Sequence, residues 1–394
     1  MKSGSTYSVL FLASWYPTRI KPTHGIFIQR HAEAIALYNK VNVVYAAADA
    51  LSNNEEYQLV ENTSGKLRTV IVYYKKVNAK LPLIKNVIRL NRVFKAYKKG
   101  IQHISNQQGK QDILHLNVVL PVGLIALWIS RKLKLKYIVS EHWSGYLPED
   151  GNYKGFFNKL ITQKVISAAQ LVTVVSQRMQ QSMIAHRLQN KFERINYVIN
   201  TDIFYPKKNS PSGNKLKLIH VSSLVNREKN ITGILSVMKR LKENGIDFQL
   251  NIVGTGREIN EYINYVKINE LHKHVIFVGH KLPAEVAEYI REAHAFILFS
   301  YFEGMPNVLL ESLSCGTPVI SSKVGAVPEH IDHKLGILVD VANEDQLYDA
   351  ILNIKDSVLN YSIEEMNSFI QKNFSAASVG KRFTTLYGKA LAIR

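Results

Sequence analysis

Short apolar runs alternate with longer amphipathic segments along the first half of the chain. The runs lie at residues 7–13, 41–47, 68–74, 112–117, 136–142 and 171–176. Their length and their content of Val, Ile and Leu predict buried strands. The segments between them, at residues 27–39, 83–99, 121–133 and 155–168, place apolar side chains at a helical period. Because strands alternate with helices, the pattern predicts a parallel sheet with helices on both faces.

A stretch of breaker residues at 205–214 interrupts this rhythm, which then resumes at residues 217–223, 248–254, 274–280, 295–300, 317–323 and 336–340. Such a stretch is typical of a linker. The sequence therefore predicts an α/β protein with two Rossmann-like, doubly wound parallel-sheet domains, residues 1–205 and 206–373. Open sheets of this kind bind ligands beyond the carboxyl ends of their strands. We expect the two domains to face each other across a cleft.

Composition supports a globular protein of about two domains, with 394 residues, 46% of them hydrophobic and 21% charged. The single cysteine, Cys315, excludes an internal disulfide and a Cys-based zinc cluster, and we interpret it as a buried small residue without a chemical role. The apolar run at 118–129 is shorter than the roughly 20 residues of a membrane-spanning helix. The stretch at 9–13 is shorter than the apolar core of a signal peptide. These features predict a cytoplasmic protein.

Positive charge is concentrated in the first half of the chain. The net charge is +19, and residues 1–200 hold 28 basic and 10 acidic side chains against 22 and 21 in residues 201–394. Between Lys66 and Lys136 there are sixteen basic residues and one acid, Asp112. This density implies contact with a phosphate-bearing ligand, a nucleic acid or an anionic membrane.

The segment at 82–100 is both amphipathic and cationic, with Ile84, Val87 and Phe94 on one side and Lys85 and Arg89 among its charges. Two interpretations remain open: an ordinary domain helix with a solvated face, or a helix that docks on anionic lipid. No helix-turn-helix, zinc-finger or RNP pattern accompanies it, so nucleic acid is not the expected partner.

The densest chemical signal lies at residues 299–320, FSYFEGMPNVLLESLSCGTPVI. A strand is expected to end near Ser300, and a helix to begin near Pro306 or Asn307. Its unpaired amides and positive dipole end suit a diphosphate or sugar hydroxyls. Glu303 precedes this helix and Glu311 follows one turn after Asn307, which places both carboxylates toward one ligand. Taken alone, the pair favours the simpler interpretation of a helix-capping acid and a solvated acid.

The surrounding residues favour a ligand-binding role for both carboxylates instead. The segment resembles the EX7E signature of retaining glycosyltransferases of family 4, which have the GT-B fold. The resemblance implies that Glu303 contacts the donor sugar and that Glu311 holds the nucleotide ribose. It also implies that the loop amides between them contact sugar and diphosphate, which assigns donor binding to Gly304, Met305, Pro306, Asn307, Val308 and Leu309.

Further positions match the same family in the same order. The segment HVSSLVNREKN at 220–230 resembles the strand and basic loop that neutralise the leaving diphosphate, which nominates Arg227 and Lys229, although Ser223 stands where many members have Arg. The turn Gly254-Thr-Gly256 and His280 follow strands whose loops flank the nucleotide in the family. Read without the resemblance, the two cations are solvated surface and the glycines form a tight turn.

Two positions of the first domain complete the expected site. Gly25, in a loop before a helix, resembles the family's glycine loop and is expected at the donor diphosphate or the acceptor, although it follows His24 where many members carry a second glycine. His142 ends a strand and matches the histidine that lies against the donor sugar. The thirteen histidines show no HExxH or similar spacing, so we predict no metal and no cofactor.

The resemblance covers almost the whole chain and implies an activity. The expected reaction moves a hexose-type sugar from a UDP- or GDP-linked donor to an acceptor hydroxyl with retention of configuration. The expected acceptor is a lipid-linked saccharide at the inner membrane surface, reached through the basic first domain. Residues 374–394 resemble the family's C-terminal helix, which returns to the first domain. The alternatives are a GT-B nucleotide-sugar epimerase or phosphorylase, and a non-catalytic polyanion-binding module.

Overall fold

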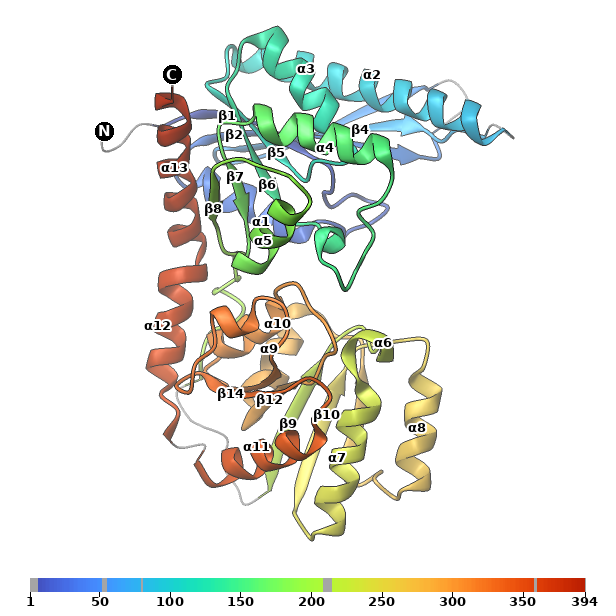
Figure 1. Cartoon of the computed structure of the whole chain (residues 1–394), viewed down its shortest axis with the longest axis vertical. Helices are drawn as coiled ribbons and strands as arrows, with labels where there is room; N and C mark the ends of the chain where they lie inside the picture. Colours follow the sequence, from blue (N-terminus) through green and yellow to red (C-terminus); the bar gives the residue numbers. More distant parts are fainter. Residues whose placement is uncertain (1–5, 52–54, 79–80, 208–214, 358–359, 394) are drawn as a thin grey trace. The chain divides into compact units, whose positions relative to one another are not determined.

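The computed structural model describes residues 6–51, 55–78, 81–207, 215–357 and 360–393. The chain forms two compact units (Figure 1). Unit 1 comprises the chain up to Val198 together with the residues from Ala376 onward, and unit 2 comprises Ile199–Ser375.

Unit 1 contains an eight-stranded sheet in the order β3-β4-β2-β1-β5-β6-β7-β8. Its strands are β1 (Ser8–Ala13), β2 (Lys40–Asp49), β3 (Tyr57–Ser64), β4 (Leu67–Lys75), β5 (Ile113–Asn117), β6 (Tyr137–Glu141), β7 (Val172–Val174) and β8 (Phe192–Arg194). The six predicted strands of this half are confirmed. The sequence did not predict β3, an additional edge strand that pairs antiparallel with β4 in the otherwise parallel sheet. Most residues of β3 are exposed and polar, so its sequence contains no apolar run that would predict a strand.

Helices cover both faces of this sheet. They are α1 (Ile26–Ala36), α2 (Pro82–Gln108), α3 (Gly123–Leu133), the 3-10 turn η1 (Ser144–Tyr146), α4 (Phe156–Ala168), α5 (Gln177–Ala185) and α13 (Ala376–Ala392). Figure 1 shows α2, α3 and α4 along one side of the sheet. The connection through α1 runs from β1 toward the β3 edge, whereas those through α2, α3 and α4 run toward the β8 edge. Because such connections are right-handed, helices in the two directions lie on opposite faces of the sheet. Within the described ranges, no helix combines the length and the apolar composition needed to cross a membrane.

Helix α13 completes unit 1 although it is far away in sequence. It packs along α1, where Gly380 lets the two backbones approach: a Cβ there would lie 2.0 Å from the carbonyl oxygen of Ala34. The Tyr387 hydroxyl lies 2.8 Å from His115 Nδ1, under the sheet. Phe383 and Tyr387 are fully buried in the core of the unit. The last helix is therefore an integral part of this core.

Unit 2 contains a six-stranded, all-parallel sheet in the order β11-β10-β9-β12-β13-β14. The strands are β9 (Leu216–Val221), β10 (Phe248–Val253), β11 (Val275–Gly279), β12 (Ala295–Leu298), β13 (Val319–Ser322) and β14 (Gly336–Val339), which confirms all six predicted strands. The order is that of a Rossmann sheet, which reverses direction between β9 and β12. The helices are α6 (Asn226–Lys229), α7 (Ile231–Glu243), α8 (Ile259–Ile268), α9 (Pro283–Arg291), α10 (Asn307–Ser314), η2 (Val327–Glu329), α11 (Glu344–Ser357) and α12 (Ile363–Phe374).

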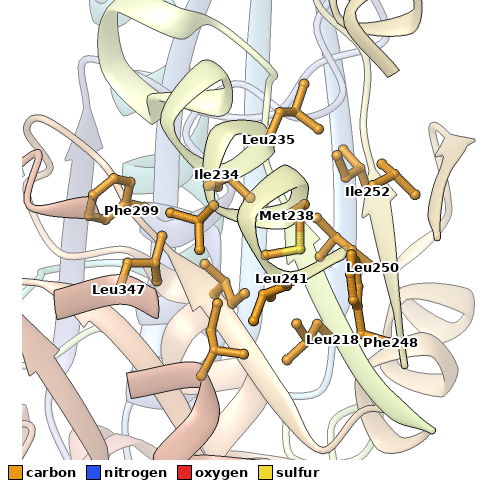
Figure 2. Packing of buried hydrophobic residues seen from close by; sticks show 14 of the residues in the cluster. Leu218, Ile234, Leu235, Met238, Leu241, Phe248, Leu250, Ile252, Phe299 and Leu347 are labelled. Carbon is orange, nitrogen blue, oxygen red and sulfur yellow. The ribbon is translucent and has the colours of Figure 1, made fainter. Parts of the chain in front are cut away.

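Helix α7 anchors the core of unit 2 (Figure 2). Its buried side chains Ile234, Met238 and Leu241 recur at helical spacing and face the strands, where Leu218 and Leu250 are also fully buried. Side chains spaced three and four residues apart form one stripe, so the helix lies flat on the sheet. This packing fixes the position of the β9–α7 connection, which carries part of the site described below.

The structure divides the chain between Val198 and Ile199, whereas the sequence prediction placed the boundary at 205/206. The physical reason is that residues 199–207 pack on unit 2. Phe204 is 1% exposed, and the Arg291 guanidinium donates to the carbonyl oxygens of Ile203 and Tyr205. Of the predicted linker, residues 208–214 lie outside the described residues.

Candidate functional site

A pocket of about 350 Å³ lies in unit 2 where the strand order reverses. The loop after β9, the loop after β12 and the first turn of α10 form most of its wall, and Lys281, Pro283 and Val286 close one side. Parallel strands that diverge leave a crevice at their carboxyl ends, which is the usual ligand position in this sheet type. The pocket therefore follows from the topology of unit 2 alone.

An ion pair crosses this pocket. Lys229 Nζ lies 2.6 Å from Glu303 Oε1, and the two side chains are 15% and 11% exposed. The Ser300 hydroxyl donates to the same carboxylate oxygen over 2.8 Å. The main chain supports the arrangement, since the Tyr301 amide donates to the carbonyl oxygen of Glu228 over 2.8 Å. The loops after β9 and β12 are thus joined through both side chain and backbone.

The first turn of α10 offers backbone donors to the pocket. Pro306 is the N-cap, and no side chain caps this helix end. The first amides of a helix have no intrahelical acceptor, so those of Asn307 and Val308 are free to meet an anion. Asn307 Oδ1 is buried and has no hydrogen-bond partner among the described residues. A Cβ at Gly304 would meet open space within 4 Å, so this part of the loop lies open to an incoming group.

A buried histidine supports the floor of the pocket. His220 Nδ1 lies 2.9 Å from the carbonyl oxygen of Ile297, and Nε2 lies 2.7 Å from Ser222 Oγ. Because the carbonyl only accepts, Nδ1 carries the proton and Nε2 accepts from Ser222. Burial lowers the pKa of His220 to about 4, against the opposing bond to Ile297 and with the help of the Lys229 charge. The imidazole is neutral near pH 7 and fixes the Ser222 hydroxyl, which accepts from the Leu224 amide.

Glycines allow the loops around the pocket to pack on one another. A Cβ on Gly254, at φ +132°, would lie 1.9 Å from the carbonyl oxygen of Ser222, and one on Gly256 would lie 2.3 Å from that of Leu224. A Cβ on Gly325, at φ +54°, would lie 2.2 Å from the carbonyl oxygen of Gly304. In the described structure, Gly254 and Gly256 therefore serve the packing of the β9–α6 loop, and Gly325 packs beneath the Glu303 loop.

The structure brings together part of the predicted donor site. Six predicted residues line the pocket: Lys229, Glu303, Pro306, Asn307, Val308 and Glu311. Met305 and Leu309 are buried in the protein interior, so only their backbone is placed to contact a ligand. Arg227 and His280 are exposed and do not line the pocket, and neither do Gly254 and Gly256.

Sequence reasoning missed Lys281, Phe204 and the two serines at 222 and 223 as pocket residues. Lys281 directly follows His280, so the sequence identified the correct loop but the neighbouring residue. Phe204 was not predicted, because it directly precedes the stretch at 205–214 that was interpreted as a linker. Ser222 and Ser223 were visible as the two residues after the β9 apolar run.

In unit 1, His142 lies directly after β6 and is 8% exposed. Its ring stacks on Tyr197, with centroids 5.7 Å apart, and contacts Phe27 and His31. Neither ring nitrogen has a hydrogen-bond partner among the described residues. Burial, together with the nearby His31 and His115, lowers the pKa of His142 well below its usual value, so the ring is neutral.

The neighbouring Glu141 holds the His142 loop in place. Its buried carboxylate accepts from the amides of Val119, His142 and Trp143 and from the Tyr146 hydroxyl. Gly25, at φ +73°, is the N-cap of α1, and a Cβ there would lie 2.7 Å from the Trp15 carbonyl carbon. Both features explain local structure: the strand-end acid orders a loop, and the glycine allows a close backbone contact.

Across the described ranges, no group of three or more His, Cys, Asp or Glu side chains is arranged to hold a metal ion. The single cysteine, Cys315, is buried at the end of α10. Burial raises the pKa of its thiol to about 12.

Comparison with known proteins identifies relatives of this chain. Residues 202–373 match the family model described as glycosyl transferases group 1. An uncharacterized glycosyltransferase of Methanocaldococcus jannaschii is 26% identical over 301 residues, which cover 75% of this chain and 80% of the relative. The N-acetyl-alpha-D-glucosaminyl L-malate synthase of Bacillus anthracis is 23% identical over 291 residues, covering 71% and 75%.

Solved structures share the architecture. Sucrose-phosphate synthase from Thermosynechococcus elongatus aligns with a TM-score of 0.74 at 18% identity, covering 98% of this chain and 99% of that one. HepE from Anabaena, solved in complex with UDP, aligns with a TM-score of 0.70 at 15% identity, covering 97% and 100%. These neighbours establish the fold class, an α/β protein of the GT-B type with two Rossmann-like units.

Proposed function

We propose that this chain is a retaining glycosyltransferase that uses a nucleotide-diphosphate sugar, a proposal supported by the match of residues 202–373 to the model of glycosyl transferases group 1. The observation that carries the proposal is the pocket at the strand reversal of unit 2. It places a cation, Lys229, two carboxylates, Glu303 and Glu311, and the free end of α10 around one volume. A diphosphate, a ribose and a sugar each require one of these groups.

The diphosphate would lie against Lys229 and the first amides of α10. Both offer positive charge that is already in place before the reaction begins, which is the most effective way to stabilise a leaving group. Glu303 would accept hydrogen bonds from the donor sugar, and Glu311 from the ribose hydroxyls. The open side of Gly304 leaves room for this approach.

In the reaction, the bond between the anomeric carbon and the diphosphate oxygen breaks, and the nucleoside diphosphate leaves with the bonding electrons. The acceptor hydroxyl attacks from the same face, and a phosphate oxygen of the leaving group takes its proton. Charge on the leaving group is met by Lys229 and backbone amides, so the proposed reaction needs no metal ion. His142, which is neutral and has two unpartnered ring nitrogens, would hydrogen-bond to the donor sugar.

The acceptor is the finer part of the proposal. We propose a lipid-linked saccharide, received by unit 1, in the synthesis of a cell-surface polysaccharide or a glycolipid. The support is the charge of residues 1–200, with 28 basic against 10 acidic side chains, which suits the phosphate groups of such acceptors and of the membrane that holds them.

The first test measures thermal stabilisation by UDP, GDP, ADP and their sugar conjugates. A ligand at 100 times its Kd adds about 2.7 kcal/mol to the folded state, which is easily detected. We expect one nucleotide series to stabilise the wild type, and Lys229→Ala and Glu311→Ala to lose the effect. Lys239→Ala is the matched control, because Lys239 lies on α7 outside the pocket lining and forms an exposed ion pair with Glu243.

The second test incubates the selected donor with a lipid-phosphate-linked sugar acceptor and determines the anomeric configuration of the product by NMR. A product with the donor's configuration supports the proposal. An inverted product contradicts retention, and conversion of the donor without any transfer product favours an epimerase or phosphorylase. Absence of nucleotide binding at any salt concentration would overturn the donor site itself.

A further inference from the structure

Two phenylalanines at the start of α4 are exposed to an unusual degree. Phe156 is 74% exposed and Phe157 is 76% exposed, and their rings contact each other edge to face, with centroids 5.8 Å apart. Leu160, one turn further along the helix, is 51% exposed. A phenylalanine buries roughly 150–250 Å² when it packs, so leaving two adjacent ones in water carries a clear cost.

The first half of α2 shows the same property. Leu81, the N-cap, is 62% exposed, and Ile84, Val87 and Leu90 are 49%, 67% and 57% exposed. These side chains recur every third residue and form a strip along the helix. The second half of α2 is different, because Ala96 and Tyr97 are buried against the sheet. The start of α2 is therefore apolar without a partner in the described structure.

Topology brings these residues to one edge of unit 1. Helices α2, α3 and α4 each follow a parallel strand, so all three begin at the carboxyl edge of the sheet, on the same face (Figure 1). Helix α3 also begins with an exposed apolar residue, Leu124, at 47%. It contacts α2, because the Trp128 ring packs at a tilt against Phe94, with centroids 4.9 Å apart. We define the apolar rim as Leu81, Ile84, Val87, Leu90, Leu124, Phe156, Phe157 and Leu160.

Only positive charge accompanies the apolar rim on these helices. Helix α2 carries six Lys and Arg side chains, α3 two and α4 two, and none of the three carries Asp or Glu. Lys85 and Arg89 are exposed between the rim residues of α2, and Lys159 lies beside those of α4. Exposed apolar side chains interleaved with cations match the boundary between lipid headgroups and acyl chains.

The same charge argues against a second copy of this chain as the occupant. A two-fold interface would place the same cationic helices against each other with no acid between them, which costs several kcal/mol. A lipid surface instead supplies a phosphate for each cation. A pocket of about 370 Å³, lined by Lys21, Lys76 and Tyr97, opens at the same carboxyl edge, so a lipid-held acceptor would enter unit 1 beside the rim.

We propose that the apolar rim docks on an anionic bilayer, with Phe156 and Phe157 inserted below the headgroups and the cations of α2, α3 and α4 on the lipid phosphates. The docking itself rests on unit 1 alone, whereas its role in presenting a lipid-linked acceptor rests on the proposed function. The proposed surface extends the lipid-docking interpretation of residues 82–100 to the beginnings of α3 and α4.

The experiment sediments the full chain with vesicles of phosphatidylcholine alone or mixed with phosphatidylglycerol. We expect binding to the mixed vesicles that weakens as salt rises. The double variant Phe156→Ser/Phe157→Ser should lower the partition coefficient by about 10-fold to 100-fold, because two large apolar side chains no longer insert. The matched control is Ile263→Ser/Ile268→Ser on α8 of unit 2, where the side chains are 47% and 71% exposed; it should bind like the wild type.

Several outcomes would overturn the proposal: no binding to anionic vesicles, equal binding to neutral ones, or unchanged binding of the double phenylalanine variant. A dimer in solution that this variant abolishes would identify a second copy as the occupant instead. Thermal stabilisation by nucleotide is measured on the same samples. It reports on unit 2. A wild-type chain that binds nucleotide but not anionic vesicles would refute the rim, and one that binds vesicles but no nucleotide would refute the donor site.

Discussion

Replacement of either partner in the Lys229–Glu303 ion pair should change nucleotide binding in opposite directions. The pair joins two loops over 2.6 Å in a pocket where both side chains are largely shielded from water. If the diphosphate occupies this pocket, Lys229 must serve both Glu303 and the phosphates. Lys229→Met removes a charge that attracts the ligand, and Glu303→Gln removes a charge that repels it.

The magnitudes follow from the contacts. A hydrogen bond to a charged group contributes about 1.5–3 kcal/mol, so Lys229→Met should raise the Kd for the nucleoside diphosphate by about 10-fold to 150-fold. Glu303→Gln keeps an acceptor for the Ser300 hydroxyl, so the loop is retained. It should bind the nucleoside diphosphate as tightly as the wild type or up to about 10-fold more tightly, because Lys229 is released to the phosphates. Sugar transfer should nevertheless fall.

Stability provides a second readout of the same variants. Breaking a fully buried ion pair costs about 3–5 kcal/mol. The residual exposure of 15% and 11% and the remaining bond from Ser300 reduce our expectation for Lys229→Met to about 2 kcal/mol. For a unit of this size the melting temperature should fall by roughly 4–8 °C.

The assay is isothermal titration calorimetry with the nucleoside diphosphate selected by the thermal screen, with Lys239→Met as the control for loss of a lysine. Equal weakening by Lys229→Met and Glu303→Gln would refute the reasoning, because the pair would then serve only to hold the two loops. No effect of either variant on affinity would place the diphosphate elsewhere.

Three further predictions concern the supports of the site. Gly254→Ala should lower the free energy of unfolding in urea by at least about 3 kcal/mol, since its Cβ would lie 1.9 Å from the Ser222 carbonyl oxygen. The control is Gly245→Ala, which has open space at φ +71° and should cost only about 1 kcal/mol. Equal losses in the two variants would show that the positive φ alone determines the cost. The neutral His220, with a folded pKa of about 4 against 6.5, binds fewer protons than the unfolded chain between these values, so its contribution is complete above pH 6.5 and is lost as the pH falls to 4. His220→Asn should reduce the stability difference between pH 7 and pH 4.5 by about 2–3 kcal/mol in urea titrations, and an unchanged difference would assign the pH dependence to other groups. The Cys315 thiol, with a pKa raised to about 12 by burial, should resist iodoacetamide at pH 7.5 in mass spectra of the native protein; rapid alkylation would show that the end of α10 opens.

The sheets could be predicted from the sequence because a strand buried on both faces is a run of apolar residues. Six strands of each unit coincide with such apolar runs, although the edge strand β11 is fully buried only at Val275. β3 and β8 were not predicted, because both lie at edges of the sheet, are partly exposed and contain no long apolar run. The predicted unit boundary lies seven residues after the observed one, because residues 199–207 pack on unit 2. The burial of Phe204 and the hydrogen bonds from Arg291 are tertiary contacts, and the Gly, Pro and Asn residues that suggested a linker give no information about them.

The site was predictable in its residue types and less so in its contacts. Family resemblance nominated both Glu303 and Lys229, but nothing in the local sequence indicates that residues 74 positions apart form an ion pair. A glycine in a strand-end turn has the same sequence signature whether it admits a ligand or a backbone carbonyl. Gly304 faces open space and Gly254 faces Ser222, and only the structure distinguishes them.

The late position of α13 has a consequence for how the protein is made. Unit 1 needs the residues from Ala376 onward to cover α1 and to enclose His115, and the ribosome adds them only after all of unit 2. Unit 2 is continuous from Ile199 to Ser375 and can fold while the nascent chain is still growing. Until α13 is synthesised, part of the apolar core of unit 1 stays exposed. Unit 1 is therefore the unit that needs chaperones against aggregation during synthesis. A truncation that removes α13 would therefore damage unit 1 and leave unit 2 intact.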